Sequence, residues 1–335
     1  MIAVTGSTGL VGTHLLAHLA ASTEQVKAFY RTQGKREEAL KVIRDVYGDR
    51  TEASVAQMLW VQQDILDVQA LSTQLKDVDQ LYHCAGKISN RPAEIKITRK
   101  VNIEGTANVM NIALKLGIPK VCHVSSVAAL GHAQNEKLNE GSVRDNNKSV
   151  SNYSIAKYGA EMEAWRAAQE GLNVVIVNPG IIIGEGFYDT GSGKLLGMVR
   201  SGTNFYVDKV GGFVDVKDVA RSMMELMEQE TFNSRYILVA ENLSFKKVMH
   251  QLAGHLGQRP PKIKLRKSLL YVFWFLELIL ALFKIKKRLL TRQMINELHS
   301  KTYYDNTKIR ESLHFKFTPI QETLKRVAKH LAFQA

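Results

Sequence analysis

The hydrophobic and polar positions of this chain change period repeatedly along its first half. Short, continuous apolar runs typical of buried strands alternate with longer stretches whose apolar residues recur every three to four positions, as in amphipathic helices. The strand-like runs cover residues 2–5, 26–30, 58–62, 79–84, 120–125 and 173–178. The helical patterns cover residues 10–22, 36–47, 67–75, 96–116 and 153–170. This alternation predicts an α/β fold, a doubly wound parallel sheet with helices on both faces.

After residue 180 the alternation gives way to a glycine-rich stretch, residues 184–212, which is typical of a functional loop. Strand and helix patterns then return, and we expect them to rejoin the main domain. The chain therefore predicts a main domain formed by residues 1–180 and 213–240, and a smaller, mainly C-terminal domain formed by residues 181–212 and 241–335. In such sheets the carboxyl ends of the strands share one edge, where ligands bind.

The first strand runs directly into a turn with glycines at positions 6, 9 and 12, and a helical pattern follows at once. Glycines let the backbone turn tightly and approach phosphate oxygens, while the free N–H groups at a helix start favour an anion. A flexible loop has a similar composition, but the place between strand and helix favours a dinucleotide pyrophosphate site. The residues expected to hold it are Gly6, Ser7, Thr8, Gly9, Leu10, Val11 and Gly12.

The second strand ends without the acidic residue that would bind an adenosine ribose. Arg31, followed by Lys35, offers charge-assisted hydrogen bonds to a 2′-phosphate instead, which favours NADP over NAD. A solvated surface arginine is the alternative, and an Arg31 stacked on adenine would also accept NAD. Asp64 and Ile65, after the third strand, are expected to contact adenine. Asp64 could instead cap a helix, although Asp67 is an equally good cap.

The ends of the fourth and sixth strands also carry cofactor candidates. Small side chains after the fourth strand let the backbone pass close to the ribose and nicotinamide. The residues expected there are Cys84, Ala85 and Gly86. The turn after the sixth strand is expected to contact the carboxamide end of the nicotinamide, through Pro179, Gly180 and Ile182. Packing, or a simple strand-ending turn, would account for the same residues.

The candidate reactive centre combines the serine pair Ser125 and Ser126, at the end of the fifth strand, with Tyr153 and Lys157 at the start of the next helix. At a spacing of four, Tyr153 and Lys157 share one helical face. A nearby ammonium is expected to lower the tyrosine pKa toward neutrality, as acid-base catalysis requires. His83, His123 and His132 have no metal-ligand spacing with the cysteines, so they are interpreted as packing or surface residues and no metal is expected.

The composition gives expectations for the cellular compartment and the partners of the protein. The 335 residues include only two cysteines, Cys84 and Cys122, and no signal peptide precedes the first strand, which leads us to expect a reducing cytoplasm. The formal net charge of +13 suits an anionic partner. We expect no nucleic acid, because no helix-turn-helix, RNA-binding aromatic motif or zinc-finger spacing accompanies the charge.

Much of this charge flanks one apolar run, Leu269 to Phe283. The run contains Glu277 and is shorter than a spanning helix needs. We favour a helix packed over the substrate pocket of the smaller domain. The alternative is an interfacial helix that brings residues 262–288 to an anionic membrane, at its inner face. The basic residues are Lys262, Lys264, Arg266 and Lys267 before the run, and Lys284, Lys286, Lys287 and Arg288 after it.

Taken together, these motifs resemble the extended short-chain dehydrogenase/reductase family, in which many epimerases and dehydratases also belong. The resemblance rests on TGSTGLVG at 5–12, Asp64-Ile65, His83 to Gly86, Val101 to Thr106, His123 to Ser126, Tyr153 with Lys157, Asn178 to Gly180, and Phe213 to Ala220. Residues 26–31 and 303–310 are most similar to the dihydroflavonol-4-reductase-like and 3β-hydroxysteroid-dehydrogenase-like branches. The resemblance implies a Rossmann-type domain, a triad of Ser126, Tyr153 and Lys157, and a cleft beside a substrate domain.

The sequence departs from the family pattern at Val127, where a small residue is usual, and at Lys87, whose charge near the substrate entrance favours an anionic substrate. Our leading hypothesis is an NADP-dependent oxidoreductase that reduces a ketone or aldehyde, or oxidises the alcohol, on a largely apolar small molecule. The alternatives are a nucleotide-sugar epimerase or dehydratase with tightly held NAD(P), and a non-catalytic, membrane-associated NADP-sensing module. Helices 96–116 and 153–170 either pair across a homodimer or only cover the sheet.

Overall fold

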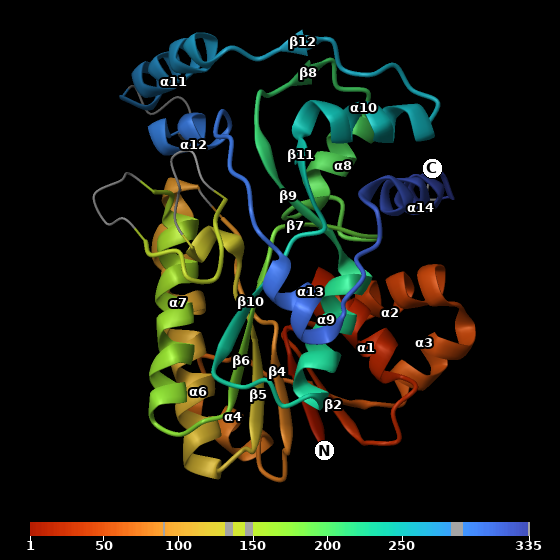
Figure 1. Cartoon of the computed structure of the whole chain (residues 1–335), viewed down its shortest axis with the longest axis vertical. Helices are drawn as coiled ribbons and strands as arrows, with labels where there is room; N and C mark the ends of the chain where they lie inside the picture. Colours follow the sequence, from red (N-terminus) through yellow and green to blue (C-terminus); the bar gives the residue numbers. More distant parts are fainter. Residues whose placement is uncertain (90, 131–136, 145–149, 283–290, 334–335) are drawn as a thin grey trace.

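A seven-stranded parallel sheet forms the centre of the molecule (Figure 1). The computed structural model describes all residues except 90, 131–136, 145–149, 283–290 and 334–335. The strand order is β10-β6-β5-β4-β1-β2-β3, and each neighbouring pair is parallel. The strands are β1 Ile2–Thr5, β2 Val26–Tyr30, β3 Leu59–Gln62, β4 Gln80–His83, β5 Lys120–Val124, β6 Val174–Pro179 and β10 Ser234–Leu238. The predicted doubly wound parallel sheet is confirmed.

Helices cover both faces of this sheet. Because side chains alternate along a strand, Val4 packs with Leu15 of α1 in one core, whereas its neighbour Ala3 packs with Met110 of α6 in the other. The helices of the main domain are α1 Leu10–Leu19, α2 Gln33–Tyr47, α3 Asp49–Ala56, α4 Val68–Gln74, α5 Ile95–Arg99, α6 Gly105–Leu116, α7 Asn152–Gln169 and α9 Val216–Glu228. The strands all end toward the same end of the molecule, so the segments that follow them meet there.

The helices differ from the predicted pattern in two places. α3 follows α2 after Gly48, where we predicted no helix; its only buried residue is Val55, so its hydrophobic pattern is weak. The single helix predicted over 96–116 consists of α5 and α6 joined by a π-helical turn, Lys100–Glu104. The turn buries Asn102, which contributes to the candidate site described below.

The rest of the chain builds a smaller unit with its own core. Three strands, in the order β11-β9-β7, form a second sheet, and β8 pairs with β12. These strands are β7 Ile181–Ile183, β8 Phe205–Tyr206, β9 Val210–Asp215, β11 Glu241–Ser244 and β12 Ile263–Lys264, and the helices are α8 Gly193–Arg200, α10 Phe245–His255, α11 Lys267–Leu282, α12 Arg292–Glu297, α13 Thr307–Leu313 and α14 Ile320–Phe333. The stretch 184–212, expected as a loop, contains α8, because Leu196 and Val199 bury one helical face.

Helix α11 coincides with the apolar run that we singled out in the sequence. It packs against α12 and lies at the upper end of the molecule in Figure 1. No helix within the described residues has the length and apolarity needed to cross a membrane. The basic residues at 284–288 and His132 lie outside the described residues.

Candidate active site

The loop after β1 is a backbone cradle that only glycine can form. Gly6 has a positive φ of 68°, and a Cβ atom on it would lie 2.5 Å from the backbone nitrogen of Ala85. A Cβ atom on Gly12 would lie 2.3 Å from the carbonyl oxygen of Gly6. The Gly9 N–H donates to that same oxygen at 3.0 Å, which closes the turn immediately before α1. The geometry therefore presents the first N–H groups of α1 at the strand-end edge, as an anion site requires.

The predicted residues of this loop divide between structural and exposed roles. The buried Ser7 hydroxyl donates to the Phe29 carbonyl at 2.7 Å and ties the loop to β2, so its side chain is already engaged. Val11 is buried in the core, whereas Thr8 and Leu10 are half-buried and Gly9 is exposed. The loop can thus contact a ligand mainly through its backbone.

Basic side chains gather beyond the end of β2. Arg31 is exposed and makes no ion pair with any described residue, while its carbonyl accepts from Gln62 at 2.9 Å. Lys35 is exposed and forms an ion pair with Glu38. Arg36 stacks over Trp60 at 5.3 Å, which orients its guanidinium beside the same strand end. Arg31 is therefore an exposed cation that makes neither an ion pair nor a stacking contact with the described residues.

The two aspartates after β3 have different partners. Asp67 caps α4, since its carboxylate accepts from the Ala70 N–H at 3.1 Å. Asp64 accepts from the Leu66 N–H at 3.0 Å and is exposed, while Ile65 is buried. Asp67, not Asp64, is thus the helix cap, which leaves the exposed carboxylate of Asp64 as the adenine candidate.

Ser126, Tyr153 and Lys157 come together at the end of β5. The tyrosine hydroxyl is hydrogen-bonded to Ser126, whose oxygen also accepts from the Ala128 N–H at 3.2 Å. The Lys157 ammonium donates to the Val124 carbonyl at 2.8 Å and lies 3.7 Å from where a Cβ atom on Gly86 would be. The sequence starts α7 here because Ser151 is its N-cap, accepting from the Ser154 N–H.

Burial dominates the electrostatics of this group. Burial raises the pKa of Tyr153 to about 12, against the opposite effect of its hydrogen bond with Ser126. Burial lowers the pKa of Lys157 to about 8, against the attraction of Glu161. The lowered tyrosine pKa that we expected is therefore wrong for this structure, because the ammonium is bound to the Val124 carbonyl and the phenol is desolvated.

A buried glutamate that we did not single out in the sequence supports the serine pair. Glu161 is fully buried and accepts hydrogen bonds from the Ser125 hydroxyl, from Asn178 Nδ2 at 2.7 Å and from Arg235 Nη1 at 2.8 Å. Asn178 also donates to the Ser126 carbonyl at 3.1 Å. The Ser125 hydroxyl is thus engaged in this network, whereas that of Ser126 faces Tyr153. The signal in the sequence was a carboxylate four residues after Lys157, on the buried face of the helix.

Asn102 is a second positioning residue. In the sequence it stood out only as a member of the family motif Val101 to Thr106. Its side chain accepts from the Lys87 N–H at 2.8 Å and donates to the Lys87 carbonyl at 2.9 Å, so it fixes the backbone just after Gly86. The Lys87 ammonium lies 3.1 Å from the Glu94 carboxylate. This ion pair offsets the charge that we took as favouring an anionic substrate.

The remaining predicted residues occupy the same edge. The Cys84 N–H donates to the Thr5 carbonyl at 3.0 Å. Cys84 is half-buried and Cys122 is buried, and both are free thiols. Gly180 donates its N–H to Leu238 at 3.0 Å, next to Pro179 at the end of β6 and Ile182 in β7. Ala85 lies with Cys84 against Gly6 of the glycine loop, and Gly86 lies beside Asn102 and Lys157.

His83 and His123 stack in the buried sheet with ring centroids 5.2 Å apart, which confirms them as packing residues. Their burial lowers the pKa of His83 to about 3, so both rings are neutral in the folded protein at physiological pH. The described residues contain no group of three side chains able to hold a metal.

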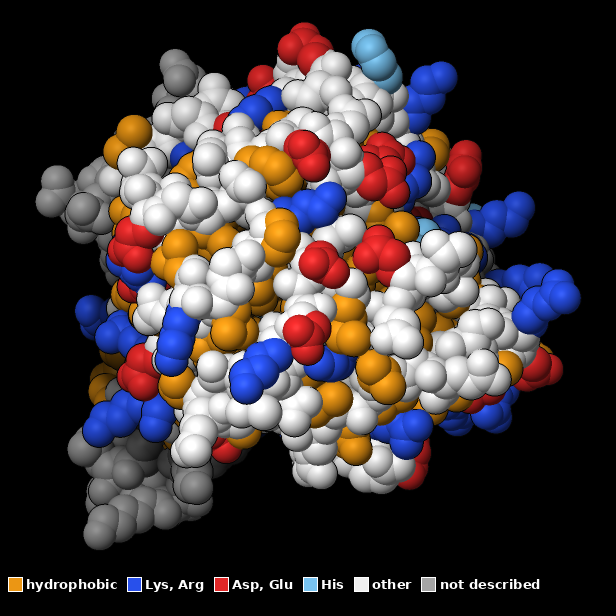
Figure 2. All heavy atoms as spheres, turned by 90° about the horizontal axis from the view of Figure 1, so that it is seen from below, with side chains coloured by type: hydrophobic (Ala, Val, Ile, Leu, Met, Phe, Trp, Pro, Cys, Tyr) orange, Lys and Arg blue, Asp and Glu red, His pale blue; other side chains and the backbone are white. Residues whose placement is uncertain are grey.

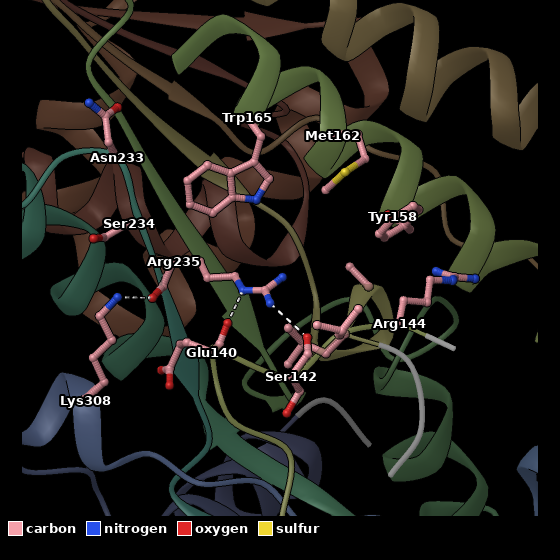
Figure 3. Close-up of a pocket in the computed structure, with 14 residues that line it drawn as sticks. Glu140, Ser142, Arg144, Tyr158, Met162, Trp165, Asn233, Ser234, Arg235 and Lys308 are labelled. Atoms are coloured by element: carbon pink, nitrogen blue, oxygen red, sulfur yellow. Dashed lines mark hydrogen bonds between the residues drawn. The ribbon is translucent and has the colours of Figure 1, made fainter. Parts of the chain in front are cut away.

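A separate pocket of about 390 Å³ lies between α7 and β10 (Figure 3). Tyr158, Met162 and Trp165 point into it from α7, and Arg235 crosses it to donate to the Glu140 and Ser142 carbonyls at 2.8 and 3.1 Å. None of the predicted cofactor or catalytic residues lines it. The pocket is therefore distinct from the candidate active site.

Comparisons with known proteins agree with this arrangement. A protein of Synechocystis sp., provisionally named a dihydroflavonol 4-reductase, is 31% identical over 286 residues, which cover 83% of this chain and 79% of the relative. Sterol demethylase protein B of Methylococcus capsulatus is 28% identical over 270 residues, with coverages of 78% and 77%. The crystal structure of gox2253 matches with a TM-score of 0.82 at 25% identity, over 100% of this chain and 98% of that one.

The model of the NAD-dependent epimerase/dehydratase family matches residues 2–239, a span that includes every candidate cofactor and catalytic residue. The predicted resemblance to extended short-chain dehydrogenase/reductases and the prediction of an NAD(P)-dependent enzyme are thereby confirmed. The cradle after β1, the reactive group after β5 and this match lead to one conclusion: the chain belongs to the NAD-dependent epimerase/dehydratase family.

Proposed function

We propose that this protein is an NADP-dependent reductase of a ketone or aldehyde on a largely apolar small molecule. The observation that carries the proposal is the hydrogen bond between Tyr153 and Ser126, with the Lys157 ammonium beside Gly86 at the same sheet edge as the glycine cradle. Two relatives with reductase or sterol-related names support the apolar carbonyl class. The smaller unit, residues 181–212 and 241–335, is proposed to supply most of the substrate contacts.

The residues present fit a nicotinamide dinucleotide. The cradle of Gly6 and Gly12 leaves no side chain between the backbone and a pyrophosphate, and it ends at the N–H groups of α1. Asp64 and Arg31 would hold the adenosine end, and Lys157 the ribose hydroxyls next to the nicotinamide. When bound, the reduced nicotinamide supplies the hydride for such a reduction.

The chain itself would supply and place the proton. With a pKa of about 12, Tyr153 keeps its proton at neutral pH, so it is ready to donate to the substrate oxygen. The Ser126 hydroxyl would donate a second hydrogen bond to that oxygen and stabilise the charge that develops on it. The Lys157 ammonium, held by the Val124 carbonyl beside Gly86, would keep the ribose next to the nicotinamide in place through its hydroxyls.

A screen of apolar ketones and aldehydes tests this function. We expect NADPH to be consumed with at least one apolar carbonyl class, measured as loss of nicotinamide absorbance. Failure across the whole set would contradict the proposal. An isomerised or dehydrated nucleotide sugar formed with no net NADPH consumption, seen by product chromatography, would establish the epimerase or dehydratase alternative instead.

The preference for NADP has its own test in Arg31. We expect Arg31→Gln to weaken NADPH binding by roughly 10–100-fold and to leave NADH binding unchanged, because a charge-assisted hydrogen bond contributes roughly 1.5–3 kcal/mol. Fluorescence titration of both nucleotides measures the two dissociation constants. Arg50→Gln, at an exposed arginine of α3, is the matched control and should alter neither. A wild-type protein that prefers NADH would contradict the assignment of Arg31.

A further inference from the structure

Among the described residues, helix α11 packs against the protein through one of its faces. Leu270 is buried, the Tyr271 hydroxyl donates to Asn296 at 3.2 Å, and Arg292 stacks over Trp274 at 4.6 Å. Asn296 and Arg292 both belong to α12, so α12 covers this face. The interpretation that we favoured from the sequence, a packed helix, accounts for this side of α11 only.

The opposite face of α11 is an open apolar stripe. Its residues are Leu269, Val272, Phe273, Leu276 and Leu280, each between 37% and 55% exposed. Their spacing of three and four positions places them on one side of the helix. Single exposed apolar residues are ordinary, but a continuous stripe of large ones marks an interaction surface. We call these five residues the α11 stripe.

Positive charge lies at the start of the α11 stripe. Lys262, Lys264, Arg266 and Lys267 are all exposed in the segment that enters the helix. Lys264 pairs with Asp208 at 2.7 Å, whereas the other three make no ion pair within the described residues. The sequence after the helix adds further basic residues, which lie outside the described part of the chain. Large apolar side chains next to uncompensated cations are complementary to an anionic lipid surface.

The opposite end of the molecule has no such organisation. Figure 2 views that end from below and shows apolar, basic and acidic side chains interspersed across it. In Figure 1, α11 lies instead toward the end at which the sheet strands terminate, the end that carries Tyr153 and Lys157. An amphipathic helix with cations at its start is of the kind that lies along a bilayer surface.

We propose that the α11 stripe and the basic segment before it dock the protein on an anionic lipid surface. The stripe would enter the boundary between headgroups and acyl chains, and the cations would contact lipid phosphates. The orientation would turn the reactive end of the protein toward the membrane. The docking surface shares no residue with the proposed catalytic group, so the docking proposal does not depend on the reductase activity.

Vesicle co-sedimentation of the full chain tests the proposal. We expect binding to phosphatidylcholine vesicles that contain one-third phosphatidylglycerol, with much weaker binding to pure phosphatidylcholine and a marked loss at high salt. The triple variant Lys262→Gln/Arg266→Gln/Lys267→Gln should bind at least tenfold more weakly, since each basic residue near an anionic surface contributes a factor of about five. The triple variant Leu269→Gln/Phe273→Gln/Leu276→Gln should bind the anionic vesicles no better than the wild type binds pure phosphatidylcholine.

Matched controls separate docking from net charge and misfolding. Lys115→Gln/Lys325→Gln/Lys329→Gln removes the same charge from exposed positions on α6 and α14 and should bind as the wild type does. All variants should keep wild-type NADPH affinity, which reports the folded main domain. Failure of the wild-type protein to bind anionic vesicles at low salt would overturn the proposal. A second outcome would also overturn the proposal: a wild-type protein that does not bind vesicles and forms a dimer that Leu269→Gln/Phe273→Gln/Leu276→Gln abolishes. A second copy of the chain would then cover the α11 stripe.

Discussion

Tyr153→Phe is expected to lower the turnover of a carbonyl substrate by roughly 10²–10⁴-fold, the range that removal of a positioned general acid gives. The substitution deletes only the hydroxyl that is hydrogen-bonded to Ser126 and leaves the half-buried ring in place. NADPH affinity should stay within about twofold of the wild type, since the phosphate cradle and Arg31 are untouched. Single-turnover oxidation of NADPH and fluorescence titration measure the two quantities separately.

Tyr158→Phe is the matched control for this prediction. Tyr158 lies on the same helix, next to Lys157, but its ring stacks on Arg144 at 4.7 Å and lines the separate pocket of Figure 3. Its loss of a hydroxyl should leave turnover nearly unchanged. Should Tyr153→Phe retain most of the wild-type rate while Tyr158→Phe does not, the proton donor would have to be assigned elsewhere.

The location of the candidate site could be predicted from the sequence because a topological rule supplies it. In a parallel sheet every strand ends at the same edge, so the motifs after the separate strands had to meet. Gly6, Gly86, Ser126 and Gly180 all follow strands of this sheet or its immediate continuation. The rule needs only strand positions, and those are well marked by continuous apolar runs.

The supporting contacts could not be predicted, because they join residues that are distant in the sequence. Glu161 meets Arg235 across 74 positions, and Asn102 meets Lys87 across 15. The pKa of Tyr153 depends on where the Lys157 ammonium points, and no spacing rule states that it donates to the Val124 carbonyl. Helical spacing gives the shared face of two side chains, but the hydrogen-bond partners decide their electrostatics.

A second long-range cluster, around Arg326 of α14, also could not be predicted from the sequence patterns. Arg326 of α14 donates to both carboxylate oxygens of Asp215, at 2.9 and 2.7 Å, and to the carboxylate of Glu185. Both acids are buried, with at most 1% of their surface exposed. One guanidinium therefore compensates two buried carboxylates at the junction of β9, α9 and α14.

Arg326→Met is accordingly expected to lower the free energy of unfolding by about 3 kcal/mol at neutral pH, because removal of one partner leaves buried charge uncompensated. This is the lower end of the usual range, since the Arg326 side chain is 32% exposed. Urea unfolding followed by tryptophan fluorescence measures the loss. Lys329→Met, at an exposed position one turn along α14, should change stability little.

The pH dependence of this loss distinguishes an ion pair from simple packing. Burial alone would raise the pKa of Glu185, but the hydrogen bond and charge of Arg326 outweigh burial, and that pKa lies below its ordinary value of 4.5. The stabilisation is then complete above the unfolded-state pKa and is lost as the pH falls through the lower folded-state pKa. In Arg326→Met, burial without the cation should raise the pKa of Glu185, so the variant gains relative stability as the acid is protonated. The stability difference between wild type and variant should therefore be largest near neutral pH. It should shrink as the pH falls through the raised pKa of Glu185 in the variant and then through its lowered pKa in the wild type, whereas a difference that stays constant with pH would identify lost packing as its cause.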